Sequence, residues 1–288
     1  MIRSVLIVVI LGLLAACSGV RLGYNSADKV LAWRMADWFD LSDGLRQPAR
    51  DRLHRVLAWH RQEELPRYAH ILRSAERRLA DPAPLGASEL LALQQQVTGR
   101  LQVLGGRVAD EFAEVLVQFG PAQRRRLLAR LAENNDEFRE DYVEADAGAL
   151  RKRRMDQLVD RYQFWLGRLS PGQRAHIEHW VEARGTDAAW RLSLRQDRQR
   201  VFVGIVDEAV QGKSPPQTAS RLRAFFSDLE APSAAPVRAR HEEGERARAQ
   251  LTADLFNMAT PAQRDKARER LRRLAEDCLA LAGQGAGS

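Results

Sequence analysis

The chain has 288 residues, which is enough for one large or two modest hydrophobic cores. It carries 45 Lys and Arg against 38 Asp and Glu, a formal net charge of +7, and nearly all of the basic residues are arginine. Acidic residues are interspersed with basic clusters such as 124–126 and 151–154, so we interpret the charge as the solvated faces of helices, and we expect no nucleic-acid partner.

The N-terminus has the order of a secretory signal peptide. One basic residue, Arg3, precedes an apolar run from Val5 to Leu14, and small residues follow the run. The run is too short to cross a bilayer, which requires about twenty apolar residues. We therefore predict that residues 1–16 are a signal peptide that is removed.

Residues 14–17 read Leu-Ala-Ala-Cys, which resembles the lipobox of bacterial lipoproteins. In that family the cysteine is acylated on sulfur and becomes the new N-terminus, so the resemblance implies that Cys17 is a lipid anchor in an envelope membrane. Ser18 stands where inner-membrane retention signals carry Asp, which implies the outer membrane, facing the periplasm. The alternative is an ordinary signal peptide that is cut elsewhere, with Cys17 incidental.

Cys278 is the only other cysteine. Once Cys17 is acylated, no internal disulfide can form. Cys278 shares a helical stripe with Leu271, Leu274 and Leu281, so we predict a small buried hydrophobe instead of a reactive thiol.

The segment from Tyr24 to Leu41 is the most distinctive part of the chain. We expect residues 17–24 to form a short tether and residues 25–282 a helical domain. Trp33, Asp37 and Asp40 would share one helix face, on which an exposed aromatic side chain could bind a protein partner or contact the membrane interface. The alternative is ordinary core packing along a neighbouring stripe: Leu31, Met35 and Trp38.

Helical periodicity continues along the rest of the chain. Apolar stripes run over 53–79, where Pro66 predicts a kink or break, and over 90–119. Gly105 and Gly106 weaken the second helix by about 1 kcal/mol each relative to alanine, and close packing of another helix is the usual reason to tolerate them. Further stripes follow in 127–142, 155–169, 177–181, 190–210, 222–229, 251–258 and 271–278.

Proline- and glycine-rich breaks separate these helices at 81–86, 212–216 and 231–236, and the tail 283–288 should be disordered. No alternating run is long enough for a strand. We therefore predict an all-α fold, an elongated bundle of about eight to ten helices, and leave open whether they form one bundle or two.

One short motif recurs at 119–124, 169–174 and 259–264, with the form x-[Gly/Ser/Thr]-Pro-x-Gln-Arg. The second and third copies resemble the LTxxQ motif of Spy- and CpxP-like periplasmic chaperones. Helix starts explain the same residues, because Ser170 and Thr260 would be N-caps whose capping boxes Gln173 and Gln263 complete. We favour the helix-start interpretation.

A broader resemblance covers roughly residues 17–230. The chain looks like a family of uncharacterised lipoproteins of Gram-negative bacteria, which implies a helical lipoprotein and supplies no catalytic residues. The matching segments are 23–25, 33–41, 58–68, 137–140 and 162–174.

The sequence contains no nucleophile elbow, Walker loop or dinucleotide fingerprint. His176 and His179 could share a metal on one helix, but a third ligand and the HExxH pattern are missing, so we expect no metal and no cofactor. The leading hypothesis is a non-enzymatic scaffold or assembly factor, anchored in the membrane through Cys17, that binds an envelope protein of unknown identity. The alternatives are a Spy-like stress chaperone and an envelope hydrolase.

Overall fold

A computed structural model of the chain describes residues 19–185 and 187–284. Cys17 and the predicted signal peptide, residues 1–16, lie outside these residues. The described part contains helices and turns and no strand, so the all-α prediction is confirmed there. In these ranges no helix is both long enough and apolar enough to cross a membrane.

The described residues divide into two compact units, which answers the question of one bundle or two. Unit 1 consists of residues 19–62, 100–144 and 187–231, and unit 2 consists of residues 63–99, 145–185 and 232–284. Each unit therefore takes three separate stretches of the chain. The helix α6 (Ala87–Leu116) contributes its first part to unit 2 and its second part to unit 1.

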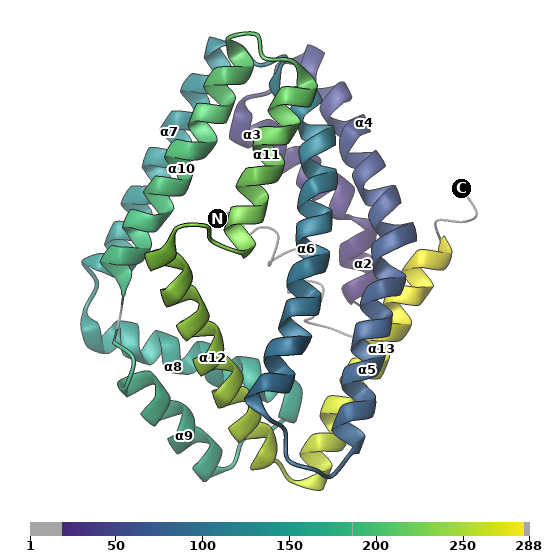
Figure 1. Ribbon diagram of the computed structural model, residues 1–288, viewed down its shortest axis with the longest axis vertical. Coiled ribbons are helices and arrows are strands. Elements are labelled where there is room, and N and C mark those ends of the chain that lie inside the picture. Colours follow the sequence, from purple (N-terminus) through teal and green to yellow (C-terminus); the bar gives the residue numbers. More distant parts are fainter. Residues whose placement is uncertain (1–18, 186, 285–288) are drawn as a thin grey trace. The chain divides into compact units, whose positions relative to one another are not determined.

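Unit 1 is a bundle in which α7 packs against both α3 and α10, and α10 packs against α11 (Figure 1). Its core joins residues from each of its three stretches of chain, including Leu45, Leu116 and Leu222. Besides its part of α6, its helices are α2 (Gly19–Asn25), α3 (Ala27–Phe39), α4 (Asp43–Trp59), α7 (Pro121–Phe138), the π-helical turn η2 (Arg139–Val143), α10 (Ala188–Val210) and α11 (Pro215–Glu230).

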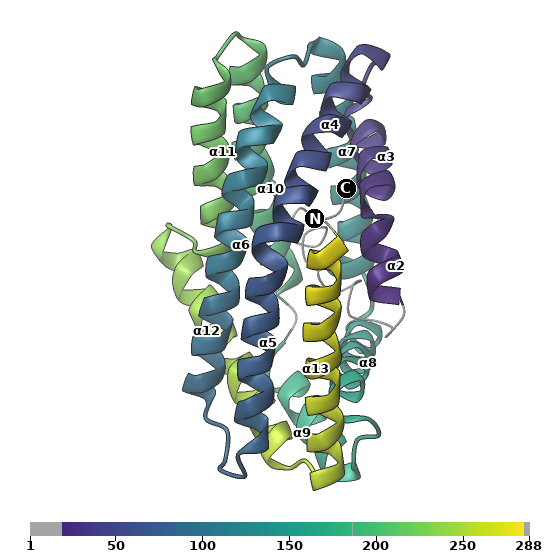
Figure 2. The same ribbon diagram turned by 90° about the vertical axis from the view of Figure 1, so that its right-hand side faces the viewer.

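Unit 2 is built around the pair α5 and α13, which lie side by side (Figure 2). Helix α8 contacts α13 and α9, and α9 contacts α12. A second π-helical turn, η1 (His60–Glu64), whose first three residues belong to unit 1, directly precedes α5. The helix therefore changes its hydrogen-bonding pattern just before Pro66, where a kink or break was expected, and continues without interruption. The helices of this unit are α5 (Leu65–Ala80), α8 (Ala147–Leu166), α9 (Pro171–Glu182), α12 (Ala235–Asn257) and α13 (Pro261–Gln284).

The three predicted breaks all separate helices. Residues 81–86 lie between α5 and α6, residues 212–216 span the end of the turn after α10 and the start of α11, and residues 231–236 lead into α12. The chain divides into more helices than expected, because the segment 19–59 alone forms three. Helix α13 continues to Gln284, two residues into the predicted tail.

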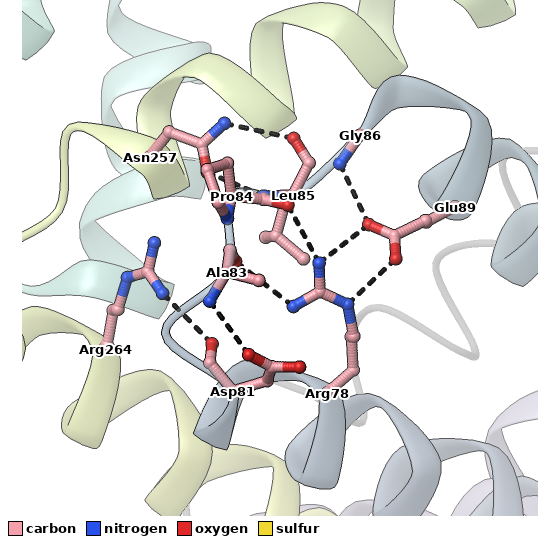
Figure 3. Close-up of polar contacts among 9 residues, drawn as sticks. All are labelled: Arg78, Asp81, Ala83, Pro84, Leu85, Gly86, Glu89, Asn257 and Arg264. Atoms are coloured by element: carbon pink, nitrogen blue, oxygen red, sulfur yellow. Dashed lines mark hydrogen bonds and ion pairs between the residues drawn. The ribbon is translucent and has the colours of Figure 1, made fainter.

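The break at 81–86 is an ordered loop in unit 2 (Figure 3). The Arg78 guanidinium donates to both carboxylate oxygens of Glu89 at 2.9 Å and to the carbonyls of Ala83 and Pro84. The Asn257 side chain accepts from the Leu85 amide at 2.8 Å and donates to the Leu85 carbonyl at 3.0 Å. These bonds satisfy the backbone groups that a loop leaves unpaired, and they hold Leu85 in the core of the unit.

The two glycines within α6 have different surroundings. A Cβ atom on Gly105 would lie 2.9 Å from the Cβ of Phe226, which belongs to α11 in the same unit. A Cβ on Gly106 would meet nothing within 4 Å. The close helix packing expected at this pair is therefore confirmed for Gly105 and is absent at Gly106.

Candidate binding surface on helix α3

Helix α2 is fixed to unit 1 by Tyr24, which is only 3% exposed. The Tyr24 hydroxyl is 2.9 Å from Nδ1 of His60 and 3.4 Å from the carbonyl oxygen of Leu57. The Arg61 guanidinium lies over the Tyr24 ring, 5.1 Å from its centroid. Residues 19–24 of the predicted tether therefore belong to helix α2, which is anchored on the folded body at Tyr24, seven positions after Cys17.

His60 is buried beside Tyr24, and this burial lowers the pKa of its imidazole from 6.5 to about 4. The imidazole is therefore neutral at neutral pH. In the neutral ring, Nδ1 either accepts a hydrogen bond from the Tyr24 hydroxyl or donates one to it, depending on the tautomer.

The C-cap of helix α3 is Asp40, the only non-glycine residue in the described ranges with a positive φ, 48°. In this left-handed conformation the Asp40 amide donates to the carbonyl of Ala36 and closes the last turn. The Asp40 carbonyl in turn accepts from the Gln123 side chain at 3.2 Å. Asp40 is therefore exposed at a helix terminus and helps to join α3 to α7.

Asp37 is held by α7. Both of its carboxylate oxygens accept from Nη2 of Arg130 at 2.9 Å, and Nη2 of Arg126 lies 3.9 Å away. The three groups are each between a quarter and two-fifths exposed, so this is a semi-exposed ion-pair cluster between two packed helices. The carboxylate of Asp37 is consequently occupied within unit 1.

Trp33 lies on an open face of α3, and 67% of its surface is exposed. Val30, one turn earlier, is 51% exposed, and the exposed residues Lys29 and Arg34 flank the two apolar side chains. Each of the other five tryptophans is at least partly buried. The structure thus separates the three candidate residues: Trp33 faces outward, Asp37 pairs with α7 and Asp40 ends the helix.

The neighbouring stripe of α3 faces inward, as the core-packing alternative required. Leu31, Met35 and Trp38 are partly buried, and Met35 packs against the core of unit 1. Sequence reasoning overlooked Val30, Lys29 and Arg34. Val30 and Lys29 lie three and four residues before Trp33, a spacing that makes them its neighbours on a helix, and Arg34 follows it directly in the chain.

Three residues of the basic clusters, Arg124, Arg126 and Lys152, are paired with carboxylates. Arg124 forms two hydrogen bonds with Asp207, and Lys152 lies 2.7 Å from Asp156. Together with the Asp37 cluster, these pairs show that part of the basic charge is balanced by neighbouring carboxylates on helix surfaces.

Of the two histidines that could share a metal, His176 contacts a carboxylate on another helix. Nε2 of His176 is 3.1 Å from Asp254, and within 19–185 and 187–284 no group of three His, Cys, Asp or Glu side chains is placed to hold a metal ion. Cys278 is partly buried, and burial, followed by the neighbouring charge of Asp277, raises the pKa of its thiol to about 12.

The recurrent proline motif forms helix starts. Pro121, Pro171 and Pro261 are the first residues of α7, α9 and α13, and a complete capping box is present at Ser170. Gly120 has no side chain, so only half of the box forms there: the Gln123 side chain accepts from the Gly120 amide at 3.0 Å. At the third copy, the Thr260 hydroxyl accepts from the Gln263 amide at 3.2 Å, and the Gln263 side chain accepts from the Thr260 amide at 3.0 Å. A fourth helix start, Ser214 before α11, also has a glutamine at this position, and the Gln217 side chain accepts from the Ser214 amide at 3.1 Å. This segment departs from the motif at its last position, where Thr218 replaces arginine.

Comparison with known proteins gives a family and no activity. No curated protein and no solved structure matches the chain. The matching family model covers residues 37–231, which include Asp37, Asp40 and most of unit 1. The chain therefore belongs to a family of unknown function, DUF6279.

Proposed function

We propose that the protein is a lipoprotein anchored through Cys17 in the outer membrane, facing the periplasm, and that it binds envelope proteins without catalysing a reaction. The proposal rests on the hydrogen bond between Tyr24 and His60, because Tyr24 follows the predicted anchor by only seven positions and is already held on the folded body. A lipid on Cys17 would then hold a folded helical body close to the membrane, with almost no linker between them. Such an arrangement suits a scaffold or assembly factor that must act at the membrane surface.

Exposed apolar side chains offer contact points for a partner on helices other than α3. Leu128 on α7 is 37% exposed and Val201 on α10 is 49% exposed. Apolar side chains in such positions are typical anchors of helical protein–protein contacts. We expect the partner to bind at faces of this kind.

The chaperone alternative depended on the glutamine-containing motif. Gln173 and Gln263 are both engaged at helix starts, where they hydrogen-bond to their own caps and to each other. Because capping explains these residues completely, the motif gives the chaperone interpretation no separate support.

The test is site-specific photo-crosslinking in cells with the full chain. A photoreactive amino acid would replace Val201 or Leu128 in turn, and buried Val206 would serve as the control position. We expect one or two envelope proteins to recur at the exposed positions and not at the control. A broad set of unrelated proteins whose yield rises under stress would contradict the scaffold proposal in favour of a chaperone, and turnover of an envelope substrate by the purified protein would contradict the non-enzymatic claim.

A further inference from the structure

We propose that the face of α3 formed by Val30, Trp33, Lys29 and Arg34 lies on the membrane surface and contacts anionic lipid headgroups. The inference rests on the proposed anchor at Cys17 and adds an orientation to it: unit 1 meets the bilayer through α3. The remaining faces of the unit are then the ones open to protein partners.

The apolar part of this face suits the boundary between headgroups and acyl chains. Trp33 and Val30 are one helical turn apart and are both more than half exposed. Tryptophan is enriched at membrane interfaces because its ring is largely apolar while its N–H can donate to polar headgroups. A helix that presents such residues on one side and basic residues beside them lies along the interface plane.

The charge of the face matches an anionic surface. Lys29 and Arg34 are exposed on either side of the apolar pair. Asp37, one helical turn after Trp33, is hydrogen-bonded to Arg130, so its charge is offset within the unit. Each basic residue close to an anionic leaflet raises the binding constant for that membrane about fivefold.

The predicted anchor is close enough for this contact. Trp33 follows Cys17 by sixteen positions, and most of the intervening residues belong to α2 and α3. At about 1.5 Å per helical residue and about 3.4 Å per extended one, Trp33 can lie no more than about 30 Å from Cys17. Because Tyr24 fixes α2 to unit 1, the first helix cannot swing away from α3 by itself.

The test uses the full-length protein isolated from membranes and reconstituted into vesicles of phosphatidylcholine and phosphatidylglycerol. Brominated acyl chains in these vesicles quench tryptophans that enter the interface. We expect Trp33→Phe to remove most of the quenching. Trp180→Phe, which alters a partly buried tryptophan held between Arg154 and Arg184 in unit 2, should leave it unchanged.

A second variant tests the charge without touching the reporter. Lys29→Gln combined with Arg34→Gln should reduce the quenching in vesicles that contain phosphatidylglycerol, while Arg174→Gln, an exposed arginine on α9, should not. All substituted residues except Trp180 are exposed, so helix content measured by circular dichroism should match that of the wild type.

The outcomes separate this inference from the proposed anchor. Mass spectrometry and vesicle flotation report whether Cys17 is lipidated and the protein is membrane-bound. If the protein is lipidated and floats, yet Trp33→Phe is quenched as strongly as the wild type, the anchor stands and the contact of α3 with lipid is overturned. If Cys17 carries no lipid, the anchor fails, and the same variants added to preformed brominated vesicles still decide whether the α3 face binds lipid.

Discussion

The side-chain amides of Gln173 and Gln263 hydrogen-bond to each other in both directions, at 3.2 and 3.1 Å. Each glutamine also accepts from the backbone amide of its own N-cap, Ser170 or Thr260. The starts of α9 and α13 therefore meet within unit 2, although they are ninety positions apart. Two copies of one sequence motif form a single hydrogen-bonded pair.

Removing Gln173 should cost more stability than removing an isolated capping glutamine. Gln173 is completely buried and also donates to the carbonyl of Leu255, so Gln173→Ala leaves buried polar groups without partners and should lower the free energy of unfolding by about 1–3 kcal/mol. Gln217→Ala removes an exposed box of the same kind and should cost about 1 kcal/mol or less. Urea unfolding followed by circular dichroism measures both, and equal losses would contradict a special role for the pair.

The adjacent glycines of α6 provide a matched pair of substitutions. Gly105→Ala would place a methyl group 2.9 Å from the Cβ of Phe226, which cannot move without its backbone, and overpacking of this kind costs about 1–3 kcal/mol. Gly106→Ala points into open space and should stabilise the helix by up to about 1 kcal/mol. The thermal midpoints should shift in opposite directions. A gain in both variants would show that α11 does not pack against Gly105.

Burial of neutral His60 should make unit 1 less stable as the pH falls. The pKa is about 4 in the folded state against 6.5 for the free side chain, so between these values the unfolded chain binds a proton that the folded chain excludes. The contribution of neutral His60 to the free energy of unfolding is complete above pH 6.5 and is lost as the pH falls toward 4. The total change in this free energy is about 3 kcal/mol. Unfolding free energies measured at pH 7, 5.5 and 4.5 test this trend.

The control separates His60 from other titrating groups. His60→Gln should flatten this part of the pH dependence, whereas His54→Gln, a substitution of an exposed histidine on the adjoining helix, should retain it. Identical slopes in wild type and His60→Gln would mean that His60 is not buried as a neutral ring.

Cys278 should be nearly inert while the protein is folded. A thiol pKa raised from 9.0 to about 12 lowers the thiolate fraction at pH 8 by roughly a thousandfold, and the thiolate is the reactive form. Reaction with an aromatic disulfide reagent should be correspondingly slow and should become fast in denaturant. Fast labelling of the folded protein would show that the thiol is accessible and readily ionised.

Much of the fold follows from local sequence patterns. Helical periodicity and breaks such as 81–86 depend on neighbouring residues, as does the N-cap of Ser170, so these features were predictable. The pairing of α5 with α13 and the division into two units depend on residues up to about two hundred positions apart, which one sequence does not reveal. The π-helical turns were also missed, because no residue pattern marked them.

The candidate site was predictable only in part. The outward position of Trp33 follows from its place on the face opposite the core stripe of α3. The engagement of Asp37 depends on Arg130, ninety-three positions later, and could not be inferred from spacing. Tyr24 was assigned to the tether because its partner, His60, lies thirty-six positions later, at the end of α4, and the sequence does not show that the two meet.

Mass spectrometry of the N-terminal peptide, with the protein purified from cell membranes, tests the central claim most directly. We expect the mature chain to begin at Cys17, with a diacylglyceryl group on the sulfur, and the protein to partition with the outer membrane. A chain that begins elsewhere, or a Cys17 that carries a free thiol, would contradict the anchor and the membrane-bound function derived from it.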